Sequence, residues 1–329
     1  MAGDAERLFG LPWEELQGRA WAARRQHHAD TLRFAVPGNK RYDTEDYHNT
    51  PHRFANVSVT GRQCRLMCEH CRGELLDGMM PATTPDELLA LGRRLIERGC
   101  EGLLVSGGAD ADGQVPLQPF LPALARLKEW GLAVIVHTGV VERETARGLR
   151  DAAVDQVLFD VVGDAETIRQ VLHLDLTPED YGRMLALLRE FDLPIAPHVV
   201  IGLHFGQLRG ELRALEMVRQ AEPAVVVLVV LRPLPHTPMA GLAGVDAEAV
   251  GRLAAVARLL APSTPLTLGC ARPAGLDKVE MERRAVLAGV NSVAYPDPAT
   301  VRLAGELGLT VAFLERCCTL TVGARGGAA

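Results

Sequence analysis

The feature that most constrains this chain is a regular alternation of short apolar runs with longer amphipathic segments, from residue 54 to near the C-terminus. Buried parallel strands form Val-, Ile- and Leu-rich runs, and a crossover segment, usually a helix, connects each strand to the next. The sequence predicts eight such strands, at 54–59, 101–106, 133–138, 156–161, 194–201, 224–231, 265–269 and 292–295. Eight parallel strands are the number that closes a barrel.

The segments between these runs have the spacing of amphipathic helices. Leu88, Leu91 and Leu95 fall on one face, and Thr84 with Glu87 supplies the chemistry of a capped helix start. Similar helices are expected near 119–130, 143–151, 178–190, 208–220, 245–260, 277–288 and 298–306. We therefore predict an α/β fold, a (βα)8 TIM-type barrel. A partial (βα)6 barrel is the alternative, because prolines at 223, 262 and 265 are compatible with a break after the sixth strand.

Three parts of the chain are expected to differ in organisation. Residues 1–53 are predicted to form a helical extension followed by a polar loop, and residues 54–309 the barrel. The segment 310–329 carries a cysteine pair and ends in a Gly- and Ala-rich tail, which we expect to be disordered after Leu320.

Composition limits the class of protein. Apolar residues make up 48% of the chain and charged residues 23%, which is the balance of a globular protein with a sizeable core. The net charge of -6 argues against nucleic acid and anionic membrane surfaces as partners. The N-terminus lacks the pattern of a secretory signal, and the longest apolar run, 224–231, is too short to span a bilayer. A cytoplasmic protein is expected.

Three cysteines, Cys64, Cys68 and Cys71, follow directly after the first predicted strand, at the end where barrels carry their active sites. Seven cysteines in total, with three of them so close together, suit metal ligation better than a disulfide framework. Three thiolates at this spacing can bind three corners of a 4Fe-4S cluster. The alternative is a structural zinc site, with Cys100 or Cys270 as the fourth ligand.

The pattern Cys64-x-x-x-Cys68-x-x-Cys71 after the first strand of a βα array resembles the signature of the radical S-adenosylmethionine (radical SAM) superfamily. This resemblance implies a 4Fe-4S cluster whose free iron binds SAM and a reductive cleavage of SAM to a 5′-deoxyadenosyl radical. It also implies an electron donor, ferredoxin or flavodoxin. His70 stands where many members carry an aromatic residue.

The resemblance extends to predicted SAM contacts. Ser106-Gly107-Gly108 ends the second strand and is similar to the family's Gly-Gly-Glu type motif, although Ala109 replaces the acidic residue; a tight turn is the alternative. Asp160 ends the fourth strand and is expected to accept from a ribose hydroxyl, or else to cap a helix. The adenine is expected to pack on a segment of the fifth strand that contains His198, Val200, Gly202 and Leu203. A strand-end histidine with no ligand is the alternative for His198.

Other segments resemble the biotin synthase-like branch, namely the N-terminal helical region and residues 232–239. Within it, residues 57–76, 268–273 and 315–320 are similar to the archaeal-type lipoyl synthase that is divided over two proteins. This similarity implies sulfur insertion into an unactivated C–H bond of an octanoyl chain on a carrier protein. It also implies an auxiliary Fe-S cluster as sulfur source and a sister radical SAM subunit.

Three late cysteines are candidates for that auxiliary cluster. Cys270 ends the seventh predicted strand, and Cys317-Cys318 lie on a terminal segment that can fold back over the barrel mouth. The alternative is a buried core thiol and an unrelated pair. Arg272 is expected to ligate or orient the cluster, to bind a carboxylate, or to form a structural ion pair. Two other functions stay open: a single-cluster biotin synthase-like enzyme of cofactor maturation, and a non-enzymatic zinc-binding barrel.

Overall fold

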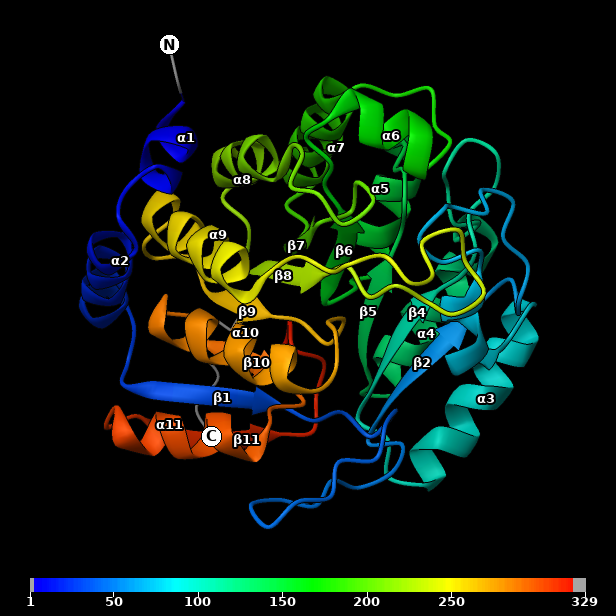
Figure 1. The fold of residues 1–329 in the computed structure, drawn as a ribbon. Coiled ribbons are helices and arrows are strands. Elements are labelled where there is room, and N and C mark those ends of the chain that lie inside the picture. The colour runs from blue at the N-terminus through cyan, green and yellow to red at the C-terminus, as the bar shows by residue number, and fades with distance from the viewer. Residues whose placement is uncertain (1–2, 322–329) are drawn as a thin grey trace.

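A single curled sheet forms the centre of the computed structural model, which describes residues 3–321 (Figure 1). All pairings between its strands are parallel, in the order β11-β1-β10-β9-β8-β7-β6-β5-β4-β2-β3. The strands are β1 (Thr31–Ala35), β2 (Phe54–Ser58), β3 (Met80–Pro81), β4 (Gly102–Ser106), β5 (Ala133–His137), β6 (Gln156–Asp160), β7 (Ile195–Ile201), β8 (Val226–Val230), β9 (Leu266–Leu268), β10 (Ser292–Ala294) and β11 (Thr310–Leu314).

The predicted barrel-type α/β class is confirmed, since all eight expected strands are present as β2 and β4 to β10. The sheet is wider than expected because β1 and β11 continue it beyond β10 and β3 continues it beyond β2. Within residues 3–321 the edge strands β11 and β3 are not paired with each other, so the barrel is open between them.

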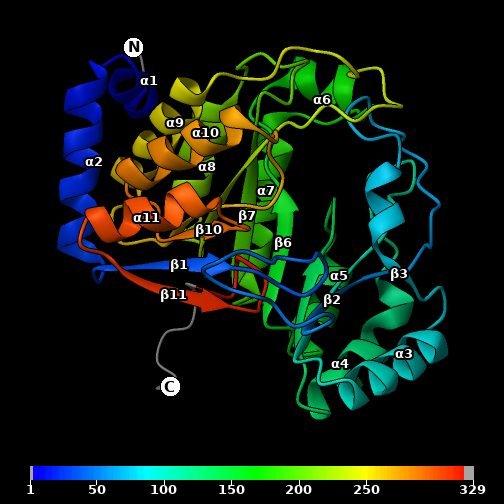
Figure 2. The same ribbon diagram turned by 60° about the horizontal axis from the view of Figure 1, so that its bottom comes forward.

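Helices cover the outer face of the sheet (Figures 1 and 2). Every predicted helix is present, and the Thr84 hydroxyl accepts from the Glu87 amide at the start of α3 as expected. The α-helices are α1 (Asp4–Phe9), α2 (Trp13–His27), α3 (Pro85–Glu97), α4 (Leu121–Glu129), α5 (Arg143–Asp151), α6 (Ala165–Val171), α7 (Pro178–Glu190), α8 (Glu211–Gln220), α9 (Ala247–Leu260), α10 (Leu276–Leu287) and α11 (Pro298–Glu306). Two short 3-10 helices are η1 (Glu74–Gly78) and η2 (Gln118–Phe120).

The strand pleat divides the buried side chains into two sets. Along β5, Val134 and Val136 belong to the large core beneath the helices, whereas Ile135 belongs to a smaller cluster inside the barrel. Leu158 of β6 and Ala196 of β7 lie in the same inner cluster. Because side chains alternate along a strand, the residues two positions further on also face the interior, at the carboxyl ends of these strands.

The segment after β11 contacts the loop before β2 and then enters the barrel. Glu315, just after β11, accepts from the Thr50 amide at 2.8 Å and from the Tyr47 hydroxyl at 3.1 Å. The following residues enter the interior, where the Gln156 amide donates to the Thr319 carbonyl and the Thr321 hydroxyl to Ser292. Residues 315–321 therefore line the barrel from within, next to its inner apolar cluster.

The predicted division of the chain corresponds to these elements only in part. α1, α2 and β1 fall within the proposed extension 1–53, and β11 falls within the proposed C-terminal segment 310–329, yet both β1 and β11 join the barrel sheet. The boundaries themselves stay predictions. The tail that we expected to be disordered lies outside the described residues, apart from Thr321. Across residues 3–321, none of the helices combines the length and the apolar character that a membrane crossing requires.

Candidate active site

The loop after β2 brings Cys64, Cys68 and Cys71 together. A hydrogen bond from the Cys68 thiol, supported by one from His70, lowers the pKa of Cys71 to about 4. The same Cys68–Cys71 hydrogen bond, burial and the charges of Cys71 and Cys64 raise the pKa of Cys68. The three sulfur atoms are thus close enough to interact, and a thiolate is already favoured among them. This set of three converging cysteines fits a 4Fe-4S cluster.

The glycine turn after β4 is packed directly against this loop. The Gly108 amide donates to the Thr60 hydroxyl at 2.7 Å, and the Arg65 amide donates to the Ala109 carbonyl at 2.7 Å. A Cβ atom on Gly108 would lie 2.0 Å from the Gln63 carbonyl oxygen and 2.6 Å from the Cys64 Cα. Ser106, before the turn, donates its hydroxyl to the His137 carbonyl. Only glycine allows this approach, while the predicted SAM contact of Ser106, Gly107 and Gly108 stays a prediction.

A second set of contacts supports the cysteine loop from α6. The Glu69 carboxylate lies 2.9 Å from His173 Nε2 and 2.7 Å from the Arg72 guanidinium, and the Glu69 amide donates to the Val171 carbonyl. His173 Nδ1 lies 2.8 Å from the Leu66 carbonyl oxygen. Met67 and Arg72 have positive φ angles, which shows how tightly the chain turns around the cysteines. Glu69 and His173 were not identified from the sequence, because their pairing joins segments about a hundred residues apart.

Three polar side chains converge inside the barrel, at the carboxyl ends of β5, β6 and β7. The ligand atoms of His137, Asp160 and His198 all lie within 4.8 Å of one another, and His137 Nε2 lies 3.7 Å from Asp160 Oδ1. Although burial opposes it, the two histidines lower the pKa of Asp160 to about 2. Burial, with the charge of His137, lowers the pKa of His198 to about 4. At neutral pH this cluster therefore combines a carboxylate with a neutral His198.

The sequence predicted Asp160 and His198 as separate SAM contacts and did not single out His137. The strand pattern contained the missing signal, because His137 is the last residue but one of its predicted strand, as Asp160 is of the next. Both are the third inward-facing residue of a five-residue strand.

The turn after β7 contains the other residues expected near adenine. Gly202 has a φ angle of 78°, and its amide donates to the buried Glu211 carboxylate at 2.8 Å. Leu203 is buried, and Val200 is half-buried on the inward face of β7. The geometry fixes the shape of this turn, and its contact with adenine stays a prediction.

The late cysteines interact with one another electrostatically. Cys270 follows β9, and its pKa is raised by burial, with further effects from Lys40, Cys317 and Arg272. A hydrogen bond from Cys318 lowers the pKa of Cys317 to about 7. The same hydrogen bond, burial and the charges of Cys317 and Cys270 raise the pKa of Cys318. Cys318 packs in the inner apolar cluster with Leu158 and Ala196. The three thiols, from two distant segments, are thus near enough to interact electrostatically, with Cys318 in the inner apolar cluster and Cys270 exposed, and their auxiliary cluster stays a prediction.

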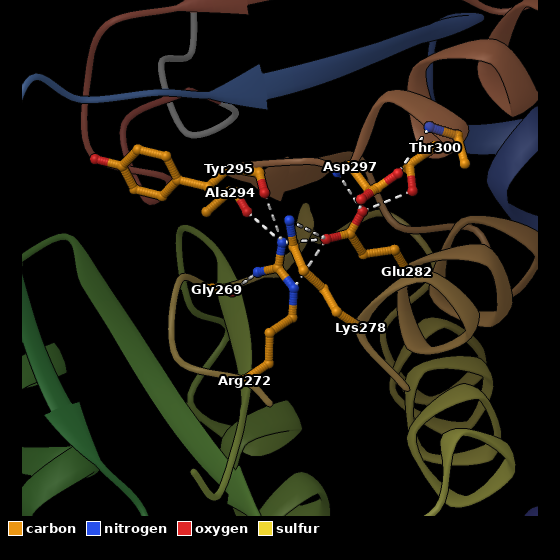
Figure 3. Close-up of polar contacts among 9 residues, drawn as sticks. Gly269, Arg272, Lys278, Glu282, Ala294, Tyr295, Asp297 and Thr300 are labelled. Atoms are coloured by element: carbon orange, nitrogen blue, oxygen red, sulfur yellow. Dashed lines mark hydrogen bonds and ion pairs between the residues drawn. The ribbon is translucent and has the colours of Figure 1, made fainter. Parts of the chain in front are cut away.

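Arg272 holds the loop that carries Cys270 (Figure 3). Its guanidinium donates to the Glu282 carboxylate and to the carbonyl oxygens of Gly269, Ala294 and Tyr295. The other Glu282 oxygen accepts from the Asp297 amide at 2.8 Å and the Thr300 hydroxyl at 2.6 Å. Of the roles considered for Arg272, the structure supports the ion pair, which fixes the Cys270 loop against the end of β10.

Comparison with known proteins agrees with this geometry. The family model "Radical SAM superfamily" matches residues 58–217. The chain is 25% identical over 307 residues to the biotin synthase of Paraburkholderia phytofirmans, covering 89% of this chain and 77% of that protein. It is 24% identical over 308 residues to the biotin synthase of Methylococcus capsulatus, covering 90% of this chain and 86% of that protein.

Two solved structures share the fold. Methylornithine synthase has a TM-score of 0.64 at 14% identity, covering 94% of this chain and 93% of that chain. The FeFe-hydrogenase maturase HydG from Carboxydothermus hydrogenoformans has a TM-score of 0.62 at 13% identity, covering 92% and 74%.

A curled parallel sheet with a three-cysteine loop after β2 defines a radical SAM enzyme, for which a 4Fe-4S cluster and SAM are the implied cofactors. Residues 58–217 of the chain form a radical SAM domain, and the relatives named biotin synthase support the biotin synthase-like branch.

Proposed function

We propose that this enzyme inserts sulfur into an unactivated C–H bond of an octanoyl chain on a carrier protein, as a component of a lipoyl synthase. The observation that carries the proposal is the electrostatic interaction of Cys270 with Cys317 and Cys318, two cysteines that pack at the inner apolar cluster of the barrel. A second Fe-S cluster on these cysteines would place a sulfur source and a radical source in one interior. The relatives named biotin synthase support sulfur insertion as the reaction type.

The residues around the cysteine loop have distinct proposed roles. When bound by Cys64, Cys68 and Cys71, the 4Fe-4S cluster together with SAM supplies the 5′-deoxyadenosyl radical. The backbone of Ser106, Gly107 and Gly108 positions the methionine end of SAM. At the other end, the adenosine contacts are assigned to Asp160, His198, Val200, Gly202 and Leu203. Their shared place at the carboxyl ends of neighbouring strands supports this division.

The interior suits an acyl substrate. Its inner lining is mainly aliphatic, with Ile135, Leu158 and Val227 buried and Val229 half-buried against them. Apolar side chains exclude water from the path of a carbon-centred radical and hold an alkyl chain without specific hydrogen bonds. The octanoyl carrier protein, a ferredoxin or flavodoxin electron donor and a sister radical SAM subunit are the partners that this reaction requires.

Iron and sulfide counting after anaerobic reconstitution tests the proposal. We expect about eight irons per chain in the wild type and about four in the triple variant Cys270→Ala, Cys317→Ala, Cys318→Ala. Cys100→Ala is the matched control, because the buried Cys100 thiol donates to the Gly102 carbonyl and belongs to neither cysteine set. About four irons in both the wild type and the triple variant would contradict sulfur donation and favour the single-cluster maturation enzyme.

A product assay completes the test. Reconstituted enzyme, SAM and reductant are incubated with an octanoylated carrier protein, and the carrier is analysed by mass spectrometry. We expect the octanoyl chain to gain the mass of one sulfur atom, as one C–H bond becomes C–SH, and the abstracted hydrogen to be recovered in 5′-deoxyadenosine. A chain that cleaves SAM but leaves the octanoyl carrier unchanged would exclude this substrate.

A further inference from the structure

The cluster of His137, Asp160 and His198 has the composition of a metal site distinct from both cysteine sets. We propose that these three residues bind one divalent first-row transition metal ion inside the barrel. Two imidazoles and one carboxylate, each from a different strand, form a donor set that leaves several coordination positions open.

The distances favour a shared ion over direct hydrogen bonding. His137 Nε2 and Asp160 Oδ1 are 3.7 Å apart, which is too long for a hydrogen bond. Two ligands that each lie about 2.1 Å from one ion are separated by about 3 to 4 Å. All three ligand atoms are within 4.8 Å of one another, so side-chain adjustments of less than about 1 Å complete the site.

The orientation of His198 is already that of a ligand. Its Nδ1 lies 2.9 Å from the Ala196 carbonyl oxygen, so Nδ1 carries the proton and Nε2 is left with a free lone pair. Metal-binding histidines are commonly fixed by such a hydrogen bond from the other ring nitrogen. The His137 ring lies 5.6 Å away and nearly edge-on, so the two imidazoles approach the same space from different directions.

The position of the cluster indicates what the ion would do. Asp160 interacts with His70, the neighbour of Cys71, on one side. On the other side, the residues two positions earlier on each strand, Ile135, Leu158 and Ala196, pack with Cys318. The ion would thus lie between the two cysteine sets, and its open positions suit an oxygen or nitrogen ligand such as a substrate amide or carboxylate. The Asp160 side chain remains 44% exposed within the barrel, which leaves room for such a ligand.

This site does not depend on the proposed sulfur insertion. Asp160 has two oxygens, so the ribose contact and a metal bond do not exclude each other. A variant of His137 tests the metal site without removing a proposed SAM contact, since no SAM contact is assigned to His137. Nitrogen and oxygen ligands accept Mn²⁺, whereas soft thiolates favour other metals. Mn²⁺ is therefore the probe that discriminates this site from the cysteines.

Mn²⁺ titration of the reconstituted enzyme, followed by the EPR signal of free Mn²⁺, tests the proposal. We expect one bound Mn²⁺ per chain and a thermal midpoint that rises with Mn²⁺. His137→Ala and His198→Ala should weaken Mn²⁺ binding at least about tenfold, because loss of a residue that only hydrogen-bonds to a metal ligand already lowers metal affinity by about that factor. His137→Asp should retain binding through its carboxylate, which distinguishes a lost ligand from a misfolded variant. His236→Ala, an exposed histidine after β8, is the matched control.

Two outcomes would overturn the proposal. One is a wild-type enzyme that binds no Mn²⁺, which would leave the three residues as polar neighbours that share no ion. The other is equal Mn²⁺ affinity in the wild type and His137→Ala. Iron is counted in the same samples, so a failure to assemble Fe-S clusters is recognised separately from a failure to bind Mn²⁺.

Discussion

At the scale of single residues, Gly108 is the described glycine at which an added Cβ atom would come closest to a neighbouring atom. Gly108→Ala would place a methyl group 2.0 Å from the Gln63 carbonyl oxygen and 2.6 Å from the Cys64 Cα. Because both of these are main-chain atoms, the cysteine loop must move, and we expect loss of most of the iron bound by Cys64, Cys68 and Cys71. The measurement is iron and sulfide per chain after reconstitution.

Gly78→Ala is the matched control, because a Cβ atom at Gly78 meets nothing within 4 Å. It should load iron as the wild type does. If Gly108→Ala also loads normally, then the loop tolerates displacement and the close approach has no part in cluster assembly.

Residues differ in how far the sequence alone could identify them. Cys64, Cys68 and Cys71 are neighbours in the chain, so their spacing predicted their meeting. Cys270 and Cys318 come from distant segments, and only their expected strand-end and terminal positions suggested a contact. The ion pair of Arg272 was among its predicted roles, but its partners could not be identified, because Glu282 lies on α10 and the Ala294 carbonyl at the end of β10.

At the scale of elements, a buried arginine joins α9 to its neighbours. The Arg258 guanidinium donates to the carbonyl oxygens of Gly289, Pro262 and Thr264. It also lies 2.8 Å from His28 Nε2, just after α2. Burial and the charge of Arg258 lower the pKa of His28 from 6.5 to about 4.

This contact predicts a pH dependence of stability. Between pH 4 and 6.5 the unfolded chain binds a proton at His28 that the folded chain does not, so the contribution of His28 is complete above about 6.5 and is lost as the pH falls toward 4. His28→Gln should therefore reduce the difference between the free energies of unfolding at pH 7 and pH 5. Urea unfolding at both pH values measures it. His27→Gln, an exposed neighbour, should behave as the wild type. An unchanged pH dependence in His28→Gln would contradict this account.

The elements also show where local patterns fail. The eight barrel strands were predicted because each has an apolar run and a following amphipathic helix. β1 and β11 pair with each other and β1 with β10, across more than 250 residues of chain. β1 is mixed in polarity, and β11 is largely half-buried, so neither has the continuous apolar run of a central strand.

At the scale of the whole molecule, the C-terminal segment completes the interior. After β11 the chain bonds to the N-terminal loop through Glu315 and then places Cys318 and Thr319 against inner faces of the sheet. This segment lies beside the residues that the Mn²⁺ proposal concerns, and it supplies two of the three auxiliary cysteines. The N-terminal loop, the edge strand β11 and the second cysteine set are therefore expected to depend on one another.

Removal of residues 315–329 tests this dependence. The deletion exposes the inner apolar cluster and leaves the Thr50 amide and the Gln156 side chain without their partners, so we expect a loss of about 3 kcal/mol or more in stability. Iron bound by the second cysteine set should also be lost, because only Cys270 remains. Removal of residues 322–329 leaves Cys317 to Thr321 in place and is the control. Thermal unfolding and iron counting measure both effects. A chain ending at Leu314 that is as stable as the control would show that the barrel interior forms without its C-terminal segment.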